Sequence, residues 1–401
     1  MKKASGHSPL LLLSIVFVAA NMRLPITLMP PLLDTIKQTF HIPTALSGLL
    51  TTIPLLTFAI MSPFIAKLGK RFGNEVIIYI LLIVLAIGSA VRIIPDVIAL
   101  FLGTLFIAIG IDGGNVLIPA VIKDHYAHRT EAITAIFTMS MLIVGALGTG
   151  LAGWLIARTT LSWTLGLLSI IAIINLILWF PNLHYRQTQN ISTTATATAA
   201  PGDSPSVWRL PTAWLITLFF GLQSLVFYSL LTWLPSILTT QGFSTIEAGN
   251  IATIMQVGTL PAAILVPMLV RYHYGVPSIL GLVFIGLSLA VFGLLLPIQS
   301  LLIHMILAFL IGLGCGASFN LAIIFFTSKT QTGHQTADLS GMAQSAGYLL
   351  AAFGPLAFGL LQSLTSSWIS TILTIAILSV ILVLCGISIH RRDTIMQQKT
   401  Q

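Results

Sequence analysis

Charged side chains are scarce in this sequence. Only 7% of its 401 residues are Asp, Glu, Lys or Arg, whereas a soluble domain carries about 25%. A chain with so few charges cannot cover a water-facing surface, which excludes an ordinary soluble domain. Because 56% of the residues are hydrophobic, we expect an integral membrane protein.

Cysteines and catalytic motifs are also nearly missing. Cys315 and Cys385 both fall in apolar segments, so we expect free thiols and neither a disulfide framework nor a CxxC metal site. The sequence contains no Walker loop, HExxH, GxSxG or paired-carboxylate pattern, and an ATP-driven pump or an enzyme therefore has little support. We expect no cofactor and no bound metal.

Long apolar runs dominate what is present. A helix needs about 20 apolar residues to cross the roughly 30 Å hydrocarbon core of a bilayer. The alternating strands of a membrane barrel are not seen, so helices are the spanning element. We expect an all-α polytopic membrane protein with twelve transmembrane helices. The expected spans are 9–33, 44–66, 76–95, 97–122, 132–156, 161–181, 211–233, 246–270, 277–297, 299–326, 339–362 and 368–389.

The cations lie mostly on one side of these spans. With the N-terminus in the cytoplasm, only Lys37 and Arg158 lie outside, and Arg23 and Arg92 fall within spans. The other lysines and arginines are then cytoplasmic, as the positive-inside rule requires. This asymmetry accounts for the net charge of +8 without a nucleic-acid partner, and it predicts that both termini are cytoplasmic.

The chain divides into two similar halves. A low-complexity polar stretch separates the sixth and seventh spans, and Pro31 and Pro235 lie 204 residues apart, as Gly48 and Gly249 lie 201 apart. A nearly constant offset indicates two repeats related by a pseudo-two-fold axis along the membrane normal. We expect an N-terminal six-helix bundle, a cytoplasmic linker and a C-terminal six-helix bundle over residues 1–183, 184–208 and 209–401.

The turn after the second span carries a family signature. The segment from Ala66 to Gly73 resembles the G-x-x-x-D-R-x-G-R-R loop of the major facilitator superfamily, with Arg71 and Gly73 in place. Lys70 replaces the aspartate, so the general gating salt bridge cannot be carried over. The resemblance implies a gating role for Lys70, Arg71 and Gly73, and the alternative is an ordinary basic turn.

Other segments resemble one branch of that superfamily. Lys-Arg-Phe-Gly-x-Glu at 70–75 is similar to the cyanate permease and 2-nitroimidazole transporter branch, as are residues 110–123, 210–235 and 339–355. The resemblance covers essentially the whole chain. It implies the major facilitator fold and a transporter, but the branch is named after a small anion and a neutral heterocycle, and fold does not fix cargo.

Arg23 is the most informative polar residue. A fixed charge near the middle of a span costs roughly 2.5–3.5 kcal/mol on insertion scales, so such a residue normally faces a watery cavity or a partner. In the superfamily, helices one, four, seven and ten line the central cavity, with additions from helices five, eight and eleven, which here carry Thr138, Gln256, Gln344 and Tyr348. For single amides and tyrosines, hydrogen bonding between helices is an open alternative. The expected solute-binding residues are Asn21, Arg23, Asn115, Gln223, Tyr228, Gln344 and Tyr348.

Asp112 lies at a depth similar to that of Arg23. At about 1.5 Å per residue, Arg23 is roughly 21 Å and Asp112 roughly 15 Å from the cytoplasmic ends of their spans. We expect an ion pair, either structural or part of a proton-linked switch. Arg92, with Asp96 four residues on, is interpreted as an anchor that snorkels at the outer helix end.

These observations predict a secondary active transporter of a small polar, anionic solute, either cyanate-like or a small organic anion. The alternative is a drug or heterocycle exporter of the same fold, and a sensor or scaffold without transport is a more distant one. The expected partners are the solute, protons and the lipid bilayer. We expect a monomer in the inner (plasma) membrane of a bacterium, with several spans.

Overall fold

The computed structural model describes residues 9–126, 129–184, 207–330 and 333–392. Twelve helices in this described part are long and apolar enough to cross a membrane, and the same residues contain no strand. The predicted all-α class and twelve spans are therefore confirmed. The predicted linker 184–208 lies outside the described residues except at its ends.

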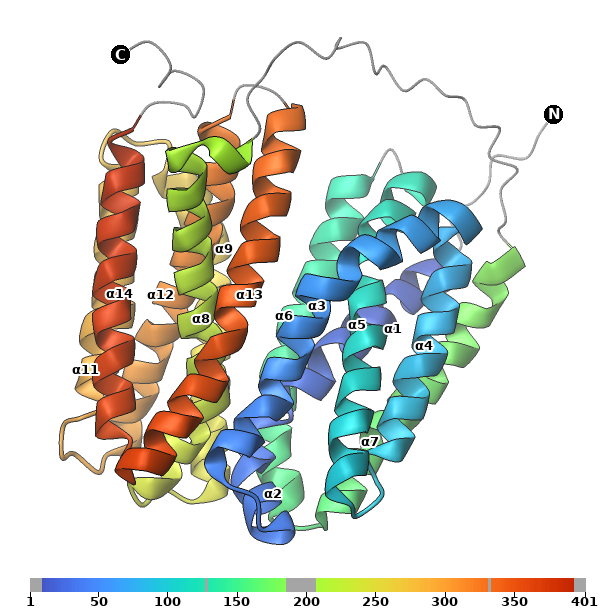
Figure 1. The fold of residues 1–401 in the computed structure, drawn as a ribbon, viewed down its shortest axis with the longest axis horizontal. Helices are drawn as coiled ribbons and strands as arrows, with labels where there is room; N and C mark the ends of the chain where they lie inside the picture. Colours follow the sequence, from blue (N-terminus) through green and yellow to red (C-terminus); the bar gives the residue numbers. More distant parts are fainter. Residues whose placement is uncertain (1–8, 127–128, 185–206, 331–332, 393–401) are drawn as a thin grey trace.

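The helices form two bundles, which Figure 1 shows side by side. The first bundle contains α1 (Pro9–Thr27), η1 (Pro30–Leu32), α2 (Leu33–Phe40), α3 (Thr44–Phe72), α4 (Asn74–Val91), α5 (Val97–His125), α6 (Thr130–Ile156), α7 (Leu161–Trp179) and η2 (Phe180–His184). The second contains η3 (Val207–Arg209), α8 (Pro211–Thr240), α9 (Thr245–Leu269), α10 (Gly275–Val283), a π-helical segment (Phe284–Leu289), α11 (Ala290–Gly293), α12 (Leu301–Ser328), α13 (Gly333–Thr365) and α14 (Ile369–His390).

The first span is longer and less regular than the sequence predicts. It runs from Pro9 to Phe40, but α1 ends at Thr27 and a short 3-10 turn precedes α2. Pro30 and Pro31 cause this break because proline has no N–H to donate to the helical ladder. The first span therefore consists of two helices, α1 and α2, separated by the 3-10 turn.

Two seams join the bundles, α3 against α13 and α6 against α9. Glycines permit the close approach: a Cβ on Gly48 would lie 2.7 Å from the carbonyl oxygen of Pro355, and one on Gly153 would lie 2.7 Å from that of Thr245. Figure 1 shows the bundles meeting at the end that carries α2 and diverging toward the end where α1 begins and α14 finishes. We call these the closed end and the open end.

Asp34 of α2 links the bundles at the closed end. Its carboxylate accepts hydrogen bonds from the hydroxyls of Ser236 at 3.2 Å and Thr239 at 3.0 Å, both on α8. Lys37 lies 2.6 Å from the same carboxylate and forms an ion pair with it. The contact holds the first span against the second bundle.

Candidate functional site

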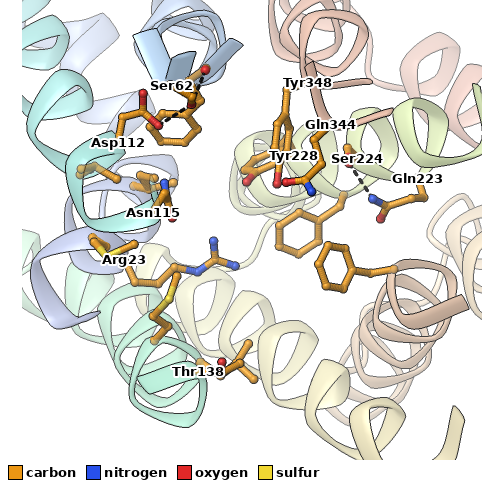
Figure 2. A pocket seen from close by; sticks show the side chains of 18 of the residues that line it. Arg23, Ser62, Asp112, Asn115, Thr138, Gln223, Ser224, Tyr228, Gln344 and Tyr348 are labelled. Carbon is orange, nitrogen blue, oxygen red and sulfur yellow. Dashed lines mark hydrogen bonds between the residues drawn. The ribbon is translucent and has the colours of Figure 1, made fainter. Parts of the chain in front are cut away.

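A cavity of about 610 Å³ lies between the two bundles. Side chains from both bundles surround it, and Figure 2 shows the polar ones facing one another across the open space. Polar or charged lining residues are Arg23, Ser62, Asp112, Asn115, Thr138, Gln223, Ser224, Tyr228, Thr259, Cys315, Asn320, Gln344, Ser345 and Tyr348. In the described residues, no cluster of three or more His, Cys, Asp or Glu side chains could hold a metal ion.

Arg23 points from α1 into the middle of the cavity (Figure 2). Its Nε is buried and has no hydrogen-bond partner, and its guanidinium carbon lies 5.9 Å from the ring centre of Phe227 on α8. The side chain passes close to α6, because a Cβ on Gly145 would lie 3.0 Å from Cγ of Arg23. A glycine at 145 thus leaves room for the arginine, and the guanidinium retains unused donors.

The wall opposite Arg23 is aromatic. The rings of Phe227 and Tyr228 lie 5.1 Å apart edge to face, those of Tyr228 and Tyr348 lie 6.5 Å apart, and Phe220 supports Tyr348 from behind at 5.4 Å. Edge-to-face pairs at such distances stabilise one another and fix the ring orientations. The second bundle therefore presents a rigid face that suits a planar solute.

Two amides flank this aromatic wall. Gln223 donates to the hydroxyl of Ser224 at 2.6 Å, and Gln344 donates to that of Ser340 at 2.8 Å. Both side chains line the cavity. Each amide has a second N–H and an oxygen that can meet a solute, so the wall offers donors and acceptors as well as rings.

Asp112 is held by Ser62 rather than by Arg23. The Ser62 hydroxyl donates to Oδ1 of Asp112 at 2.8 Å, and Oδ2 is buried without a partner. The described structure contains no ion pair between Asp112 and Arg23, so the expected contact is not formed in this state. Figure 2 places the carboxylate on the same wall of the cavity as Arg23, with Asn115 between them. A buried carboxylate with a free oxygen is suited to taking up a proton.

The two asparagines of the first bundle have different surroundings. Asn115 is exposed and lines the cavity, so its amide is open to a solute, and its role in binding stays a prediction. Asn21 is not among the lining residues. Its amide donates to the carbonyls of Phe17 at 3.0 Å and Ile171 at 3.4 Å, in the contact between α1 and α7. The structure therefore corrects the interpretation of Asn21, which joins two helices.

The basic turn lies away from the cavity. Gly73 adopts φ +96°, which a side chain would strain, and its N–H donates to the carbonyl of Gly69 at 2.9 Å, so the signature glycine ends α3. The guanidinium of Arg71 lies 5.1 Å from the ring centre of Phe72. The side chain of Lys70 lies outside what the structure describes. The gating roles of Lys70, Arg71 and Gly73 stay predictions.

Sequence reasoning missed some residues and misplaced another. Phe227, whose ring lies near the Arg23 guanidinium, and Ser62, which donates to Asp112, carried no separate signal in the sequence, although Phe227 is adjacent to Tyr228. Gln256 was expected in the cavity, but it donates to the Gly145 carbonyl at 2.9 Å and to the Thr149 hydroxyl at 2.6 Å. It joins α9 to α6 behind Arg23.

Comparison with known proteins assigns this architecture. The sequence matches the Major Facilitator Superfamily over residues 11–355. It is 34% identical to the 2-nitroimidazole transporter of Escherichia coli (strain K12), over 96% of this chain and 97% of that protein. It is 25% identical to the cyanate transport protein CynX of the same strain, over 90% of this chain and 91% of that protein.

A solved structure shares the fold. A bacterial homologue of the human lysosomal transporter Spinster, in an inward-facing and occupied conformation, has a TM-score of 0.75 at 16% identity, and the match covers 97% of this chain and 98% of that one. At that identity the likeness concerns the fold alone. The named relatives in this comparison are transporters and not enzymes.

Proposed function

The chain belongs to the major facilitator superfamily, in the branch that its motifs resemble, and from this premise we propose that it carries a small polar, anionic solute by alternating access. Transport of a small molecule across a bacterial membrane follows from the family. The anionic character of the solute and its single site between the bundles are our proposal.

Arg23 is the observation that supports an anionic solute. Its guanidinium enters the cavity, has a buried nitrogen without a partner and forms no ion pair in the described structure. A buried cation is costly unless it is paired. A carboxylate, or an anion of similar size, would accept two charge-assisted hydrogen bonds there and supply the missing charge.

The aromatic wall favours a second candidate, an uncharged planar heterocycle. Phe227, Tyr228 and Tyr348 offer flat surfaces, and a relative with 34% identity is named a 2-nitroimidazole transporter. A nitro group could accept hydrogen bonds from Arg23 without a net charge. Both candidate solutes would use the same cavity. They differ in whether Arg23 has to neutralise a negative charge on the solute.

The cation distribution supports an orientation in which the open end faces the cytoplasm. Both termini and the linker 184–208 are then cytoplasmic, and the structure represents an inward-facing state. We propose that Asp112 exchanges a proton during the cycle, since its Oδ2 is buried and unpaired. We expect the protein to act as a monomer in the lipid bilayer, because each chain contains a complete cavity.

Uptake into proteoliposomes tests the proposal. Sodium cyanate, sodium benzoate and 2-nitroimidazole are each measured with wild type, Arg23→Gln and Arg158→Gln. The control removes an exposed arginine that stacks on Trp154, with 4.5 Å between the guanidinium carbon and the ring centre. We expect saturable uptake of at least one anion, lost in Arg23→Gln and kept in the control.

Two results would contradict the anionic assignment. The first is saturable uptake of 2-nitroimidazole with none of either anion, which favours the heterocycle. The second is anion uptake that is equal in Arg23→Gln and wild type, which places the anion elsewhere.

A further inference from the structure

A second polar cavity lies at the closed end, apart from the central one. Its volume is about 410 Å³, and it is formed by α2, the turn between α4 and α5, and the turn between α6 and α7. The rim is exposed at Thr39, Thr159 and Thr160, whereas Arg92, a further lining residue, is 2% exposed. The cavity is thus open to solution and has a buried cationic residue in its wall.

Arg92 is buried, and no carboxylate forms an ion pair with it among the residues that the structure describes. It follows the last residue of α4, and its Nε has no hydrogen-bond partner. The carboxylate of Asp96 instead accepts the N–H of Ala99 at 2.9 Å and caps α5. A guanidinium stays protonated at neutral pH inside proteins. The interpretation of Arg92 as a snorkelling anchor is therefore wrong, because the residue is 2% exposed and its side chain does not extend over the outer surface.

A helix N-terminus points to the same ligand chemistry. Thr160 is the N-cap of α7, and with Leu161 and Ser162 it forms part of the cavity wall. The first N–H groups of a helix carry partial positive charge and favour an anion. Thr35 and Thr39 also line the cavity, and their hydroxyls make no hydrogen bond in the described structure. Residues with donor groups from three elements therefore line the same cavity as Arg92.

We propose that this cavity binds a small inorganic anion from the external solution, of the size of chloride or phosphate, with Arg92 as its counter-charge. A buried guanidinium without a partner is unfavourable, and a bound anion removes that cost. The exposed rim favours a dissolved ion over a lipid headgroup. The site is independent of the central cavity, since it shares no lining residue with it.

Thermal unfolding of the purified protein in detergent tests the site. Sodium chloride or sodium phosphate replaces sodium gluconate at constant ionic strength, in the Arg23→Gln background so that the central cation does not contribute. We expect a saturable rise in Tm of about 2 °C or more, because a ligand of the folded state stabilises it by mass action.

Three variants identify the residues responsible. Arg92→Gln should abolish the rise in Tm, whereas Arg158→Gln, which removes a neighbouring cation that does not line the cavity, should keep it. Thr39→Glu places a carboxylate on the exposed rim and should also abolish the rise in Tm. This variant tests the site independently if Arg92→Gln fails to fold. The proposal is overturned if neither anion shifts Tm, if the two variants at the site retain the shift, or if only added phosphatidylglycerol produces it.

Discussion

The two bundles face the central cavity with different chemistry. The first bundle contributes the charges, Arg23 and Asp112, and the second contributes rings and amides without a charge. Figure 2 shows this division directly, with the arginine pointing across the cavity toward the tyrosines. Two halves that repeat one helical plan therefore present different chemistry to the cavity, and we propose that the first neutralises the solute and exchanges protons while the second shapes the space.

Removing the charge from the first bundle should have the largest effect. Arg23→Gln is expected to lower kcat/KM for an anionic solute by about 10-fold to 100-fold, because hydrogen bonds to charged groups contribute about 1.5–3 kcal/mol. Arg23→Lys, which keeps the positive charge, should recover part of the lost kcat/KM. Initial uptake rates in proteoliposomes give the values. A larger loss in Tyr228→Phe than in Arg23→Gln would reverse the division between bundles.

Asp112→Asn should separate the two tasks of the first bundle. An amide cannot take up and release the proton, so accumulation driven by a pH gradient should disappear while exchange of labelled for unlabelled solute continues. Both activities are measured in the same proteoliposomes, with Ser62→Ala as the matched variant, which removes the 2.8 Å hydrogen bond to Asp112 and the bond of the same hydroxyl to the carbonyl of Phe58 but keeps the carboxyl group. Equal loss of accumulation and exchange would mean that Asp112 is structural.

The aromatic wall should affect selectivity more than charge recognition. Phe227→Leu removes the ring 5.9 Å from the Arg23 guanidinium, and cation–π contacts contribute about 0.5–2 kcal/mol. We expect a rise in KM of about threefold to tenfold, with a larger rise for planar solutes than for cyanate. Competition assays between cyanate and 2-nitroimidazole provide the comparison, and equal rises for both would argue against a role in shape selection.

At the closed end, Asp34 is a first-bundle charge that is hydrogen-bonded to the second bundle. Asp34→Ala removes two hydrogen bonds to α8, each worth about 0.5–1.5 kcal/mol, and should raise the population opened at this end by a few fold. Distances between spin labels on α2 and α9, measured by pulsed electron resonance, report that population. Asp96→Ala, which loses a cap within one bundle, should leave it unchanged.

Hydropathy predicts this fold well because each helix has to be apolar over enough of its own length to cross the bilayer. The second span, expected at 44–66, begins at Thr44 as α3 does, but the helix continues to Phe72 into the polar turn. The break at Pro30 and the π-helical segment Phe284–Leu289 were not predicted, because local apolar content does not report which backbone hydrogen bonds form.

In the candidate site, side-chain directions and partners could not be predicted from the sequence. Depth along a helix places Arg23 and Asp112 near one level, but it does not give the direction of a side chain or identify the competing partner, and Ser62 holds Asp112. Asn21 is two residues from Arg23, roughly 200° around the helix, and so faces α7. Pairing across a cavity depends on packing between helices that single-sequence patterns do not contain.

The glycine seams of the closed end have an electrical consequence. Backbone contacts at Gly48 and Gly153 leave little space between the bundles, so in the proposed orientation the membrane voltage falls across this short barrier while the cavity shares the potential of the cytoplasm. When the cavity instead opens to the other side of the membrane, the barrier across which the voltage falls lies on the opposite side of Arg23. Each elementary charge is worth about 2.3 kcal/mol per 100 mV. In the proposed cycle, the loaded cavity contains Arg23, a monovalent anion and protonated Asp112, and the returning empty cavity contains Arg23 and ionised Asp112. Neither cavity carries a net charge, so voltage acts on neither step, whereas in Asp112→Asn the empty cavity carries one positive charge and voltage acts on its return.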